Sequence, residues 1–273
     1  MPFVKMHGLG NDFVILDHLD GGETPGEPLL RLLADRRFGI GCDQVVRLVA
    51  SSTPECCARM EIYNPDASQA EMCGNAARCV ALYLQEKRGF TSLAVETLAG
   101  IIRPHILPDG RVAVDMGEPR LEGREIPTVW SGPVVGHTLQ AGEEEFSITA
   151  VSMGNPHCVI FHPQVEQVAL AACGPLLSEH PAFPRRTNVE FVQVVNPQRL
   201  RMRVWERGAG ITPACGTGAC ASAVAAVVNG LCQRQVVVQL DGGELEIHWR
   251  EDNRVIMIGP ASWVFAGTFW WQQ

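Results

Sequence analysis

The feature that most constrains the fold of this chain is an internal repeat. The segment RMEIYN at residues 59–64 is matched by RMRVWE at residues 201–206, an offset of 201 − 59 = 142. Cys73 is matched by Cys215 at the same offset, since 215 − 73 = 142. Further matches in the same order lie at offsets of 142 to 144: Asn11 with Asn155, Gln44 with Asn188, Gly100–Arg111 with Gly243–Arg254, and VDMGEP (114–119) with IMIGPA (256–261).

Six matches in one order predict that the chain consists of two homologous halves. We expect an N-terminal half of residues 1–118, joined by the aromatic tail 263–273, and a C-terminal half of residues 119–262. A connector rich in Gly, Pro and Glu fills residues 117–145, so the second copy of the repeat itself covers residues 146–262.

Each half alternates short β-branched runs with turn residues and contains one predicted helix. The helices are expected at residues 74–88 and 216–229, ended by Gly89 and Gly230, because glycine commonly follows the last helical turn. The second helix is Ala-rich and almost uncharged, which predicts burial on all sides. The predicted fold class is α+β, with two pseudo-symmetric halves, each a curved and mainly antiparallel sheet wrapped around a central helix. We expect the active site in the cleft between the halves.

Composition excludes several classes of protein. Hydrophobic residues make up 46% of the 273 residues and charged residues 19%, which is typical of a folded globular chain. The net charge of −8 argues against nucleic acid as a partner. No apolar run reaches the 18 residues that a membrane helix needs, and no signal-peptide pattern is seen at the N-terminus. We therefore expect a cytoplasmic protein with no membrane partner; a homodimer is left open.

Cysteine and lysine usage bears on cofactors. The chain has ten cysteines but no C-x-x-C pair, so a structural zinc site is not expected. Lys5 and Lys87 are the only lysines, which disfavours a Schiff base with pyridoxal phosphate. We expect no metal and no cofactor. Most of the cysteines, including Cys79 and Cys220 within the two helices, are interpreted as buried packing residues.

Cys73 and Cys215 stand apart because each directly precedes a predicted helix, in the sequences CGN and CGT. The first N–H groups of a helix have no partner within the helix, and the helix dipole adds partial positive charge there. Such an end binds carboxylates and favours thiolate, lowering a cysteine pKa from about 8.5 toward 7 or below. Glycine lets a ligand approach the backbone closely.

This pair of motifs predicts two-base chemistry at one carbon. If the halves are related by a pseudo-twofold axis, both helix ends hold one carboxylate, and the two sulfurs lie on opposite faces of the adjoining α-carbon. One thiolate removes a proton and the other thiol supplies one. The sequence therefore favours a racemase or epimerase that uses neither metal nor coenzyme.

The same segments resemble the diaminopimelate epimerase family. The resemblance covers nearly the whole chain and rests on these stretches: KMHGLGNDFVILD (5–17), RRFGIGCDQ (36–44), AEMCGNAARC (70–79), VSMGNPH (151–157), TNVEFV (187–192) and RVWERGAGITPACGTGAC (203–220). It implies an isomerase of amino-acid biosynthesis that interconverts LL- and meso-diaminopimelate on the route to lysine, with a small diamino-dicarboxylate as its partner.

By this resemblance Cys73 and Cys215 are the catalytic pair, and the other site residues bind substrate. The expected substrate-binding residues are Asn11, Gln44, Asn64, Gly74, Asn75, Asn155, Asn188, Glu206, Arg207, Gly216 and Thr217. The Arg207 fork suits a second carboxylate, and Glu206 can accept from an ammonium group. His157 and Glu206 are candidates for tuning the pKa of a thiol.

Two alternatives stay open at this point. One is a related two-cysteine racemase of the proline or hydroxyproline type, and the other is a non-catalytic thiol protein that senses oxidants or holds a metal. The chain also departs from the family pattern, with Ala76 in place of the usual Gly and with Ile211 and Pro213 where Glu and Leu are common. The last two precede Cys215 and bear on substrate affinity rather than on the proton transfer.

Overall fold

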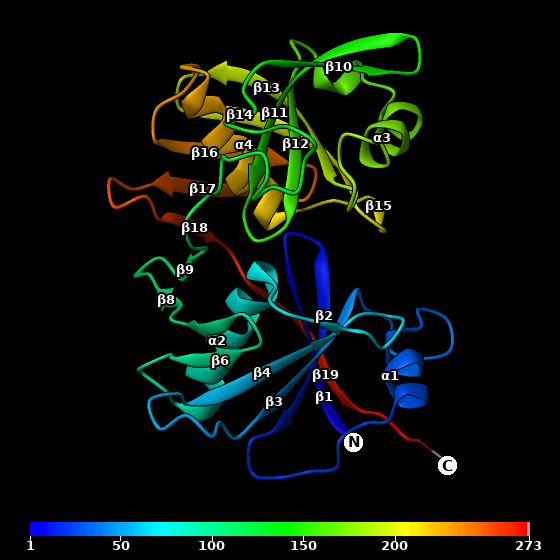
Figure 1. Ribbon diagram of the computed structural model, residues 1–273. Helices are drawn as coiled ribbons and strands as arrows, with labels where there is room; N and C mark the ends of the chain where they lie inside the picture. Colours follow the sequence, from blue (N-terminus) through cyan, green and yellow to red (C-terminus); the bar gives the residue numbers. More distant parts are fainter. Residues whose placement is uncertain (272–273) are drawn as a thin grey trace. The chain divides into compact units, whose positions relative to one another are not determined.

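The computed structural model describes residues 1–271, which divide into two compact units (Figure 1). Unit 1 consists of Met1–Val114 together with residues 259–271, and unit 2 of Asp115–Ile258. Both units mix helices with a sheet, so the predicted α+β class is confirmed. The boundaries of the duplicated segments stay a prediction, and residues 272–273 of the expected tail lie outside the described residues.

Unit 1 contains two α-helices, α1 (Glu27–Ala34) and α2 (Gly74–Arg88). Its strands are β1 (Pro2–Gly8), β2 (Asn11–His18), β3 (Gln44–Val49), β4 (Ala58–Tyr63), β5 (Gln69–Ala70), β6 (Val95–Thr97), β7 (Gly100–Ile102), β8 (His105–Ile106), β9 (Val112–Asp115), which ends in unit 2, and β19 (Ser262–Thr268).

The main sheet of unit 1 has the strand order β19-β1-β2-β3-β4-β6-β7, with β5 beside β4. The β2–β3 and β4–β6 pairs are parallel, and the other pairs are antiparallel. Strand β19 comes from the end of the chain and pairs with β1 from its start. The first and last strands of the described chain therefore lie side by side in this sheet.

Helices cover both faces of this sheet at β2. Val14 and Leu16 of β2 pack in one hydrophobic cluster with Leu30 and Leu33 of α1. The alternate residues of a strand point to the opposite face, where α2 contacts β1 and β2. Helix α2 ends as predicted at Gly89, which has a φ of 69°, a left-handed conformation that costs glycine little.

Unit 2 contains α3 (Leu170–Ser178), α4 (Gly216–Val228) and a short 3-10 helix (Val165–Gln167). Its strands are β10 (His137–Ala141), β11 (Glu144–Ser152), β12 (Pro156–Phe161), β13 (Asn188–Asn196), β14 (Arg199–Glu206), β15 (Gly210–Ile211), β16 (Gln235–Leu240), β17 (Gly243–Trp249) and β18 (Val255–Gly259).

The sheet of unit 2 repeats the strand pairing of unit 1. Phe13 pairs with Gln44 in the parallel β2–β3 pair, and His157 pairs with Asn188 in the parallel β12–β13 pair, both 144 residues later (157 − 13 = 188 − 44 = 144). The parallel β4–β6 pair is likewise matched by β14–β16. This common pairing confirms the prediction of two similar halves.

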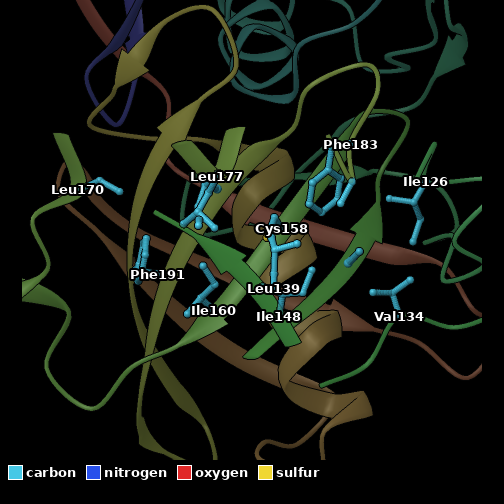
Figure 2. Close-up of a cluster of buried hydrophobic side chains, with 14 of the residues drawn as sticks. Ile126, Val134, Leu139, Ile148, Cys158, Ile160, Leu170, Leu177, Phe183 and Phe191 are labelled. Atoms are coloured by element: carbon cyan, nitrogen blue, oxygen red, sulfur yellow. The ribbon is translucent and has the colours of Figure 1, made fainter. Parts of the chain in front are cut away.

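Helix α4 is enclosed by this sheet and contacts β11, β12, β13, β14, β16 and β17. Its residues from Gly218 to Ala226 are all buried, as the uncharged Ala-rich sequence predicts. The helix ends at Val228, one residue before the predicted end. A second apolar cluster joins α3 to β10–β13 and includes Leu177, Phe183, Phe191 and Cys158 (Figure 2).

Helices α1 and α3 are additions to the predicted pattern. Helix α1 follows a Gly/Pro-rich segment and has a Pro in its first turn, a position that tolerates proline. Helix α3 carries Gly174 and Pro175 in its interior, which in a sequence argue for a break. Its packing against β13 and β14 stabilises it despite those residues.

Every helix within residues 1–271 is too short or too polar to span a bilayer.

Two adjacent residues of α3 test the packing of unit 2. Leu177 is fully buried, whereas the neighbouring Leu176 is 54% exposed. We expect Leu177→Ala to lower the free energy of unfolding by about 2–5 kcal/mol, because it leaves a cavity. The matched variant Leu176→Ala should change it by less than about 0.5 kcal/mol. Urea unfolding measures both, and equal losses would contradict the described packing.

Candidate active site

In unit 1, Cys73 is the N-cap residue of α2 and adopts an extended conformation, with φ −142° and ψ 116°. The first backbone bond of the helix runs from the N–H of Ala77 to the carbonyl of Cys73, at 2.9 Å. The N–H groups of Gly74, Asn75 and Ala76 precede that bond, so the helix offers them no carbonyl. These N–H groups are the ones that the predicted anion-binding end would use, and binding of an anion there stays a prediction.

Asn11 and Asn75 accompany Cys73, and we call these three residues the first cysteine cluster. The Cys73 sulfur lies 3.9 Å from Asn11 Oδ1, and Asn75 Nδ2 donates to the same oxygen at 3.0 Å. Asn75 is only 4% exposed, and its Oδ1 has no hydrogen-bond partner within the described chain. A buried acceptor of this kind can take a hydrogen bond from a ligand.

Gln44 and Asn64 form a second polar pair in unit 1. Gln44 starts β3 and Asn64 follows β4, and Gln44 Nε2 donates to Asn64 Oδ1 at 2.9 Å. Asn64 Nδ2 in turn donates to Ser68 Oγ at 3.0 Å. The structure therefore links these two predicted site residues to each other through their amides.

In unit 2, Cys215 is the N-cap of α4, with φ −124° and ψ 107°. The first helical bond runs from the N–H of Ala219 to the carbonyl of Cys215, at 2.9 Å. This repeats the arrangement at Cys73. The Cys215 side chain is buried and lies 3.7 Å from the hydroxyl of Thr217. We use the name second cysteine cluster for Cys215, Thr217, Asn155, His157 and Glu206.

The electrostatics of Cys215 differ from the prediction. Burial raises the pKa of the Cys215 thiol well above its ordinary value of 9.0, and the nearby carboxylates of Glu206 and Glu190 raise it further. Hydrogen bonds from Thr217 and the Gly218 N–H act in the opposite direction but do not prevail. The expectation that the helix end lowers this pKa is therefore wrong for Cys215, since desolvation and two negative charges outweigh the helix dipole.

Glu206 lies beside Cys215 and has a perturbed carboxyl group. Burial raises the pKa of Glu206, while hydrogen bonds from Thr212 and from the Cys215 thiol lower it by a smaller amount. The Thr212 hydroxyl donates to Glu206 Oε1. A thiol and a carboxyl group with raised pKa values, in direct contact, are suited to holding and passing a proton.

Asn155 and His157 complete the second cysteine cluster. Asn155 Nδ2 donates to Thr217 Oγ1 at 3.3 Å, and its Oδ1 lies 3.1 Å from His157 Nε2. The other ring nitrogen of His157 is 2.7 Å from Glu190 Oε1. Asn155 and Thr217 therefore form a chain of polar contacts between His157 and Cys215.

Asn188 and Arg207 are joined to each other rather than to a thiol. Asn188 Nδ2 donates to the carbonyl of Pro156 at 2.9 Å, and Asn188 Oδ1 accepts from the backbone N–H of Arg207 at 2.9 Å. The exposed Arg207 side chain donates to the carbonyl of Arg185 at 3.1 Å. Asn188 thus fixes the backbone that carries the Arg207 guanidinium.

Glu190 is the main residue that sequence analysis missed. It lies in β13, and its side chain is fully buried. A Cβ atom added to Gly218 would lie 2.8 Å from Glu190 Oε1 and 3.2 Å from the Cys215 sulfur, so this glycine lets the carboxylate approach the thiol. The signal available in the sequence was a charged residue, Glu190, within a strand-forming run that is otherwise mostly apolar.

The three residues at which the chain departs from the family pattern lie close in sequence to the two cysteines. Ala76 is buried in the first turn of α2, and Ile211 in β15 pairs with Trp205. The carbonyl of Pro213 accepts from the N–H of Gly242 at 2.8 Å.

Among residues 1–271, no group of three or more His, Cys, Asp or Glu side chains is arranged to hold a metal ion.

Comparison with known sequences decides the family. A sequence model described as diaminopimelate epimerase matches residues 3–122 and 149–264, which together include both cysteine clusters. The chain belongs to the diaminopimelate epimerase family. The resemblance drawn from the motifs is thereby confirmed, and the protein is an isomerase of this family.

Individual relatives in the diaminopimelate epimerase family match over almost their full length. The diaminopimelate epimerase of Magnetococcus marinus is 54% identical, with 97% of this chain and 95% of the relative covered. That of Desulforudis audaxviator is 56% identical, with 98% of each chain covered.

Solved structures share the fold at low sequence identity. A probable proline racemase from Agrobacterium radiobacter has a TM-score of 0.74 at 17% identity, covering 99% of this chain and 93% of that one. A PhzF-family phenazine biosynthesis protein from Bacillus anthracis has a TM-score of 0.67 at 16% identity, covering 98% of each. These likenesses confirm the fold class alone.

The raised pKa of Cys215 predicts a pH dependence of stability. The unfolded thiol releases its proton above its ordinary pKa of 9.0, whereas the folded thiol keeps it, so wild-type stability falls as the pH rises above 9. Cys215→Ala lacks this loss. The difference by which its free energy of unfolding falls below that of wild type (its deficit) should therefore shrink between pH 8 and pH 11. Urea unfolding in the presence of a reductant measures the deficit.

Leu177→Ala is the control for this measurement, because it removes a buried side chain without a titratable group. Its deficit should stay constant over the same pH range. A Cys215→Ala deficit that is equally constant would contradict a raised thiol pKa in the folded protein.

Proposed function

We propose that the protein converts LL-2,6-diaminopimelate to meso-diaminopimelate by two-base proton transfer at one α-carbon. Cys73 and Cys215 act on opposite faces of that carbon, without metal or coenzyme. The reaction belongs to lysine biosynthesis, as the family resemblance implies. A cytoplasmic location and a homodimer stay predictions.

The observation that carries this proposal is the equivalent position of the two thiols. Each is the N-cap of the central helix of its unit, with similar extended backbone angles. Each is followed by Gly and a short polar residue. Two thiols placed alike on duplicated units are what inversion at one carbon requires, since one group must take a proton and the other give one.

Cys215 is proposed to be protonated at the start of the reaction and to donate its thiol proton to the α-carbon. Its raised pKa keeps the thiol protonated, and Glu206 accepts a hydrogen bond from it. Cys73, as the thiolate, removes the α-proton from one face of the carbon, and the Cys215 thiol delivers its proton to the opposite face. In the reverse reaction the two cysteines exchange these roles.

The helix ends are proposed to bind the carboxylate at the reacting centre. Backbone N–H groups of Gly74, Asn75, Gly216 and Thr217 lie in the first turns of α2 and α4, where helix dipoles favour negative charge. This field also stabilises the charge that moves onto the carboxylate in the transition state. The unpartnered Asn75 Oδ1 is a suitable acceptor for the α-ammonium group.

The second centre of the substrate is proposed to be bound but not reacted. Arg207 offers a guanidinium for its carboxylate, while Gln44, Asn64, Asn155 and Asn188 provide or position amide groups. Glu206 occupies the repeat position of Asn64, since 206 − 64 = 142. The duplicated polar residues have therefore diverged, as a site that reacts at one end of its substrate requires.

A direct assay separates this substrate from the proline-type alternative. Pure protein is incubated with LL-diaminopimelate, L-proline or trans-4-hydroxy-L-proline, and products are resolved by chiral chromatography. We expect meso-diaminopimelate alone. Epimerisation of either pyrrolidine and none of diaminopimelate would overturn the assignment of substrate, and no turnover of any of the three would overturn the assigned reaction.

Single cysteine variants test the catalytic pair. Cys73→Ala and Cys215→Ala should each lower kcat for epimerisation by at least about 10²–10⁴-fold, the range that one positioned acid or base contributes. Cys79→Ala is the matched control, because Cys79 is buried in the same helix as Cys73 but is given no role. It should lose stability and keep kcat, and a near-normal kcat in either catalytic variant would contradict two-base chemistry.

A further inference from the structure

Behind Asn11 in unit 1 lies a group of four charged side chains to which the proposed chemistry assigns no role. The Asp12 carboxylate accepts hydrogen bonds from both terminal nitrogens of Arg36, at 3.0 and 2.8 Å. Its Oδ2 also lies 2.9 Å from Lys5 Nζ. Arg36 also donates to Asp43 Oδ1 at 2.7 Å. Two cations thus balance two carboxylates directly beside a predicted site residue.

Asp43 determines which way the Asn11 amide faces. Asn11 Nδ2 lies 2.9 Å from Asp43 Oδ2. An ionised carboxylate only accepts hydrogen bonds, so the end of the amide toward Asp43 must be the NH₂ group. The carbonyl end of Asn11 therefore faces Asn75 and the Cys73 sulfur.

Asp43 is itself held in a single orientation. Its Oδ1 is engaged by Arg36, and its Oδ2 accepts the backbone N–H of Asp12 at 3.1 Å as well as the amide of Asn11. Conversely, Asp12 Oδ1 accepts a hydrogen bond from the backbone N–H of Asp43 at 2.8 Å. These reciprocal bonds leave the Asp43 carboxylate no freedom to turn away from Asn11.

The equivalent asparagine of unit 2 is held in a different way. Asn155 lies between His157 Nε2 and Thr217 Oγ1. Neither of these neighbours is itself an acceptor-only group. The Glu190 carboxylate contacts the other nitrogen of the His157 ring and so acts on the Asn155 amide through that ring rather than directly. Direct contact between the asparagine amide and a carboxylate distinguishes the first cysteine cluster.

We propose that Asp43 is a positioning residue that keeps the Asn11 oxygen toward the Cys73 sulfur. An oxygen at this place accepts from the S–H group and disfavours the thiolate, so it makes Cys73 a stronger base toward the α-proton. If the amide turned over, its NH₂ group would donate to the thiolate and weaken the base. The consequence for catalysis rests on the proposed function, whereas the effect on the sulfur does not.

The test measures the reactivity of Cys73 in the full-length protein. Wild type, Asp43→Ala, Asn11→Ala and the double variant are treated with iodoacetamide at pH 7, and alkylation of Cys73 is followed by peptide mass spectrometry. We expect Asp43→Ala to alkylate Cys73 about two- to tenfold faster, the range that one ordinary hydrogen bond contributes, because Asn11 is released. In the Asn11→Ala background the Asp43 substitution should have no further effect.

Two comparisons exclude loosening of the structure as the cause of faster alkylation. Asp17→Ala also removes a carboxylate that is bonded to an arginine, Arg88, and to Tyr83 in unit 1; it should lower stability and leave Cys73 alkylation unchanged. The second comparison is the Asn11→Ala background, in which the Asp43 substitution should not change the rate of alkylation. Faster alkylation of Cys73 in Asp17→Ala, or an Asp43 effect that persists in the Asn11→Ala background, would overturn the proposal, as would no acceleration at pH 7.

Epimerisation is measured on the same four proteins and is expected to fall in Asp43→Ala while alkylation rises. A double-mutant cycle on kcat should show that the effects of Asp43 and Asn11 are not additive. Absence of epimerisation in the wild type would refute the proposed function and leave the alkylation test valid. Additive effects on kcat in an active enzyme would refute the positioning role alone.

Discussion

The structure depends on one constraint, namely that each unit encloses a helix whose first turn cannot satisfy its own N–H groups. Helices α2 and α4 both begin directly after a cysteine in extended conformation. Nearly all residues of their first turns are buried, where unpaired N–H groups are costly unless a ligand or side chain meets them. The Cys-Gly motif thus makes an anion-binding end and places a thiol beside it.

Duplication provides two such ends, and divergence makes them different. At the second, two carboxylates and full burial hold Cys215 in the protonated form. At the first, the Cys73 sulfur faces an amide oxygen whose orientation is set by Asp43. The differences lie in the neighbours of the cysteines rather than in the cysteines or the helices. A pair of thiols with unlike surroundings suits a reaction in which one starts as acid and the other as base.

The sequence was sufficient to predict the main elements of the fold. Repeat offsets, β-branched runs and the glycines after each helix located α2 and α4, and the common strand pairing follows from the duplication. Helix α3 was missed because Gly174 and Pro175 argue against a helix, and only its packing in unit 2 overrides that local preference. The pKa of Cys215 was predicted in the wrong direction because the burial of this thiol and its proximity to Glu206 and Glu190 arise from tertiary structure. Asp43 was overlooked because nothing in the motif GCDQ shows that its carboxylate meets Asn11.

The proposed action of two thiols on opposite faces of one carbon is tested by the fate of the transferred hydrogen. LL-diaminopimelate is incubated with the metal-free enzyme in D₂O, and the reaction is stopped at low conversion. Two-base transfer predicts deuterium at the α-carbon of the meso product, while the recovered LL substrate remains almost free of deuterium. Deuterium entering the LL substrate as fast as product forms would mean that a single base exchanges its proton with solvent and returns it to either face. That result would contradict the account.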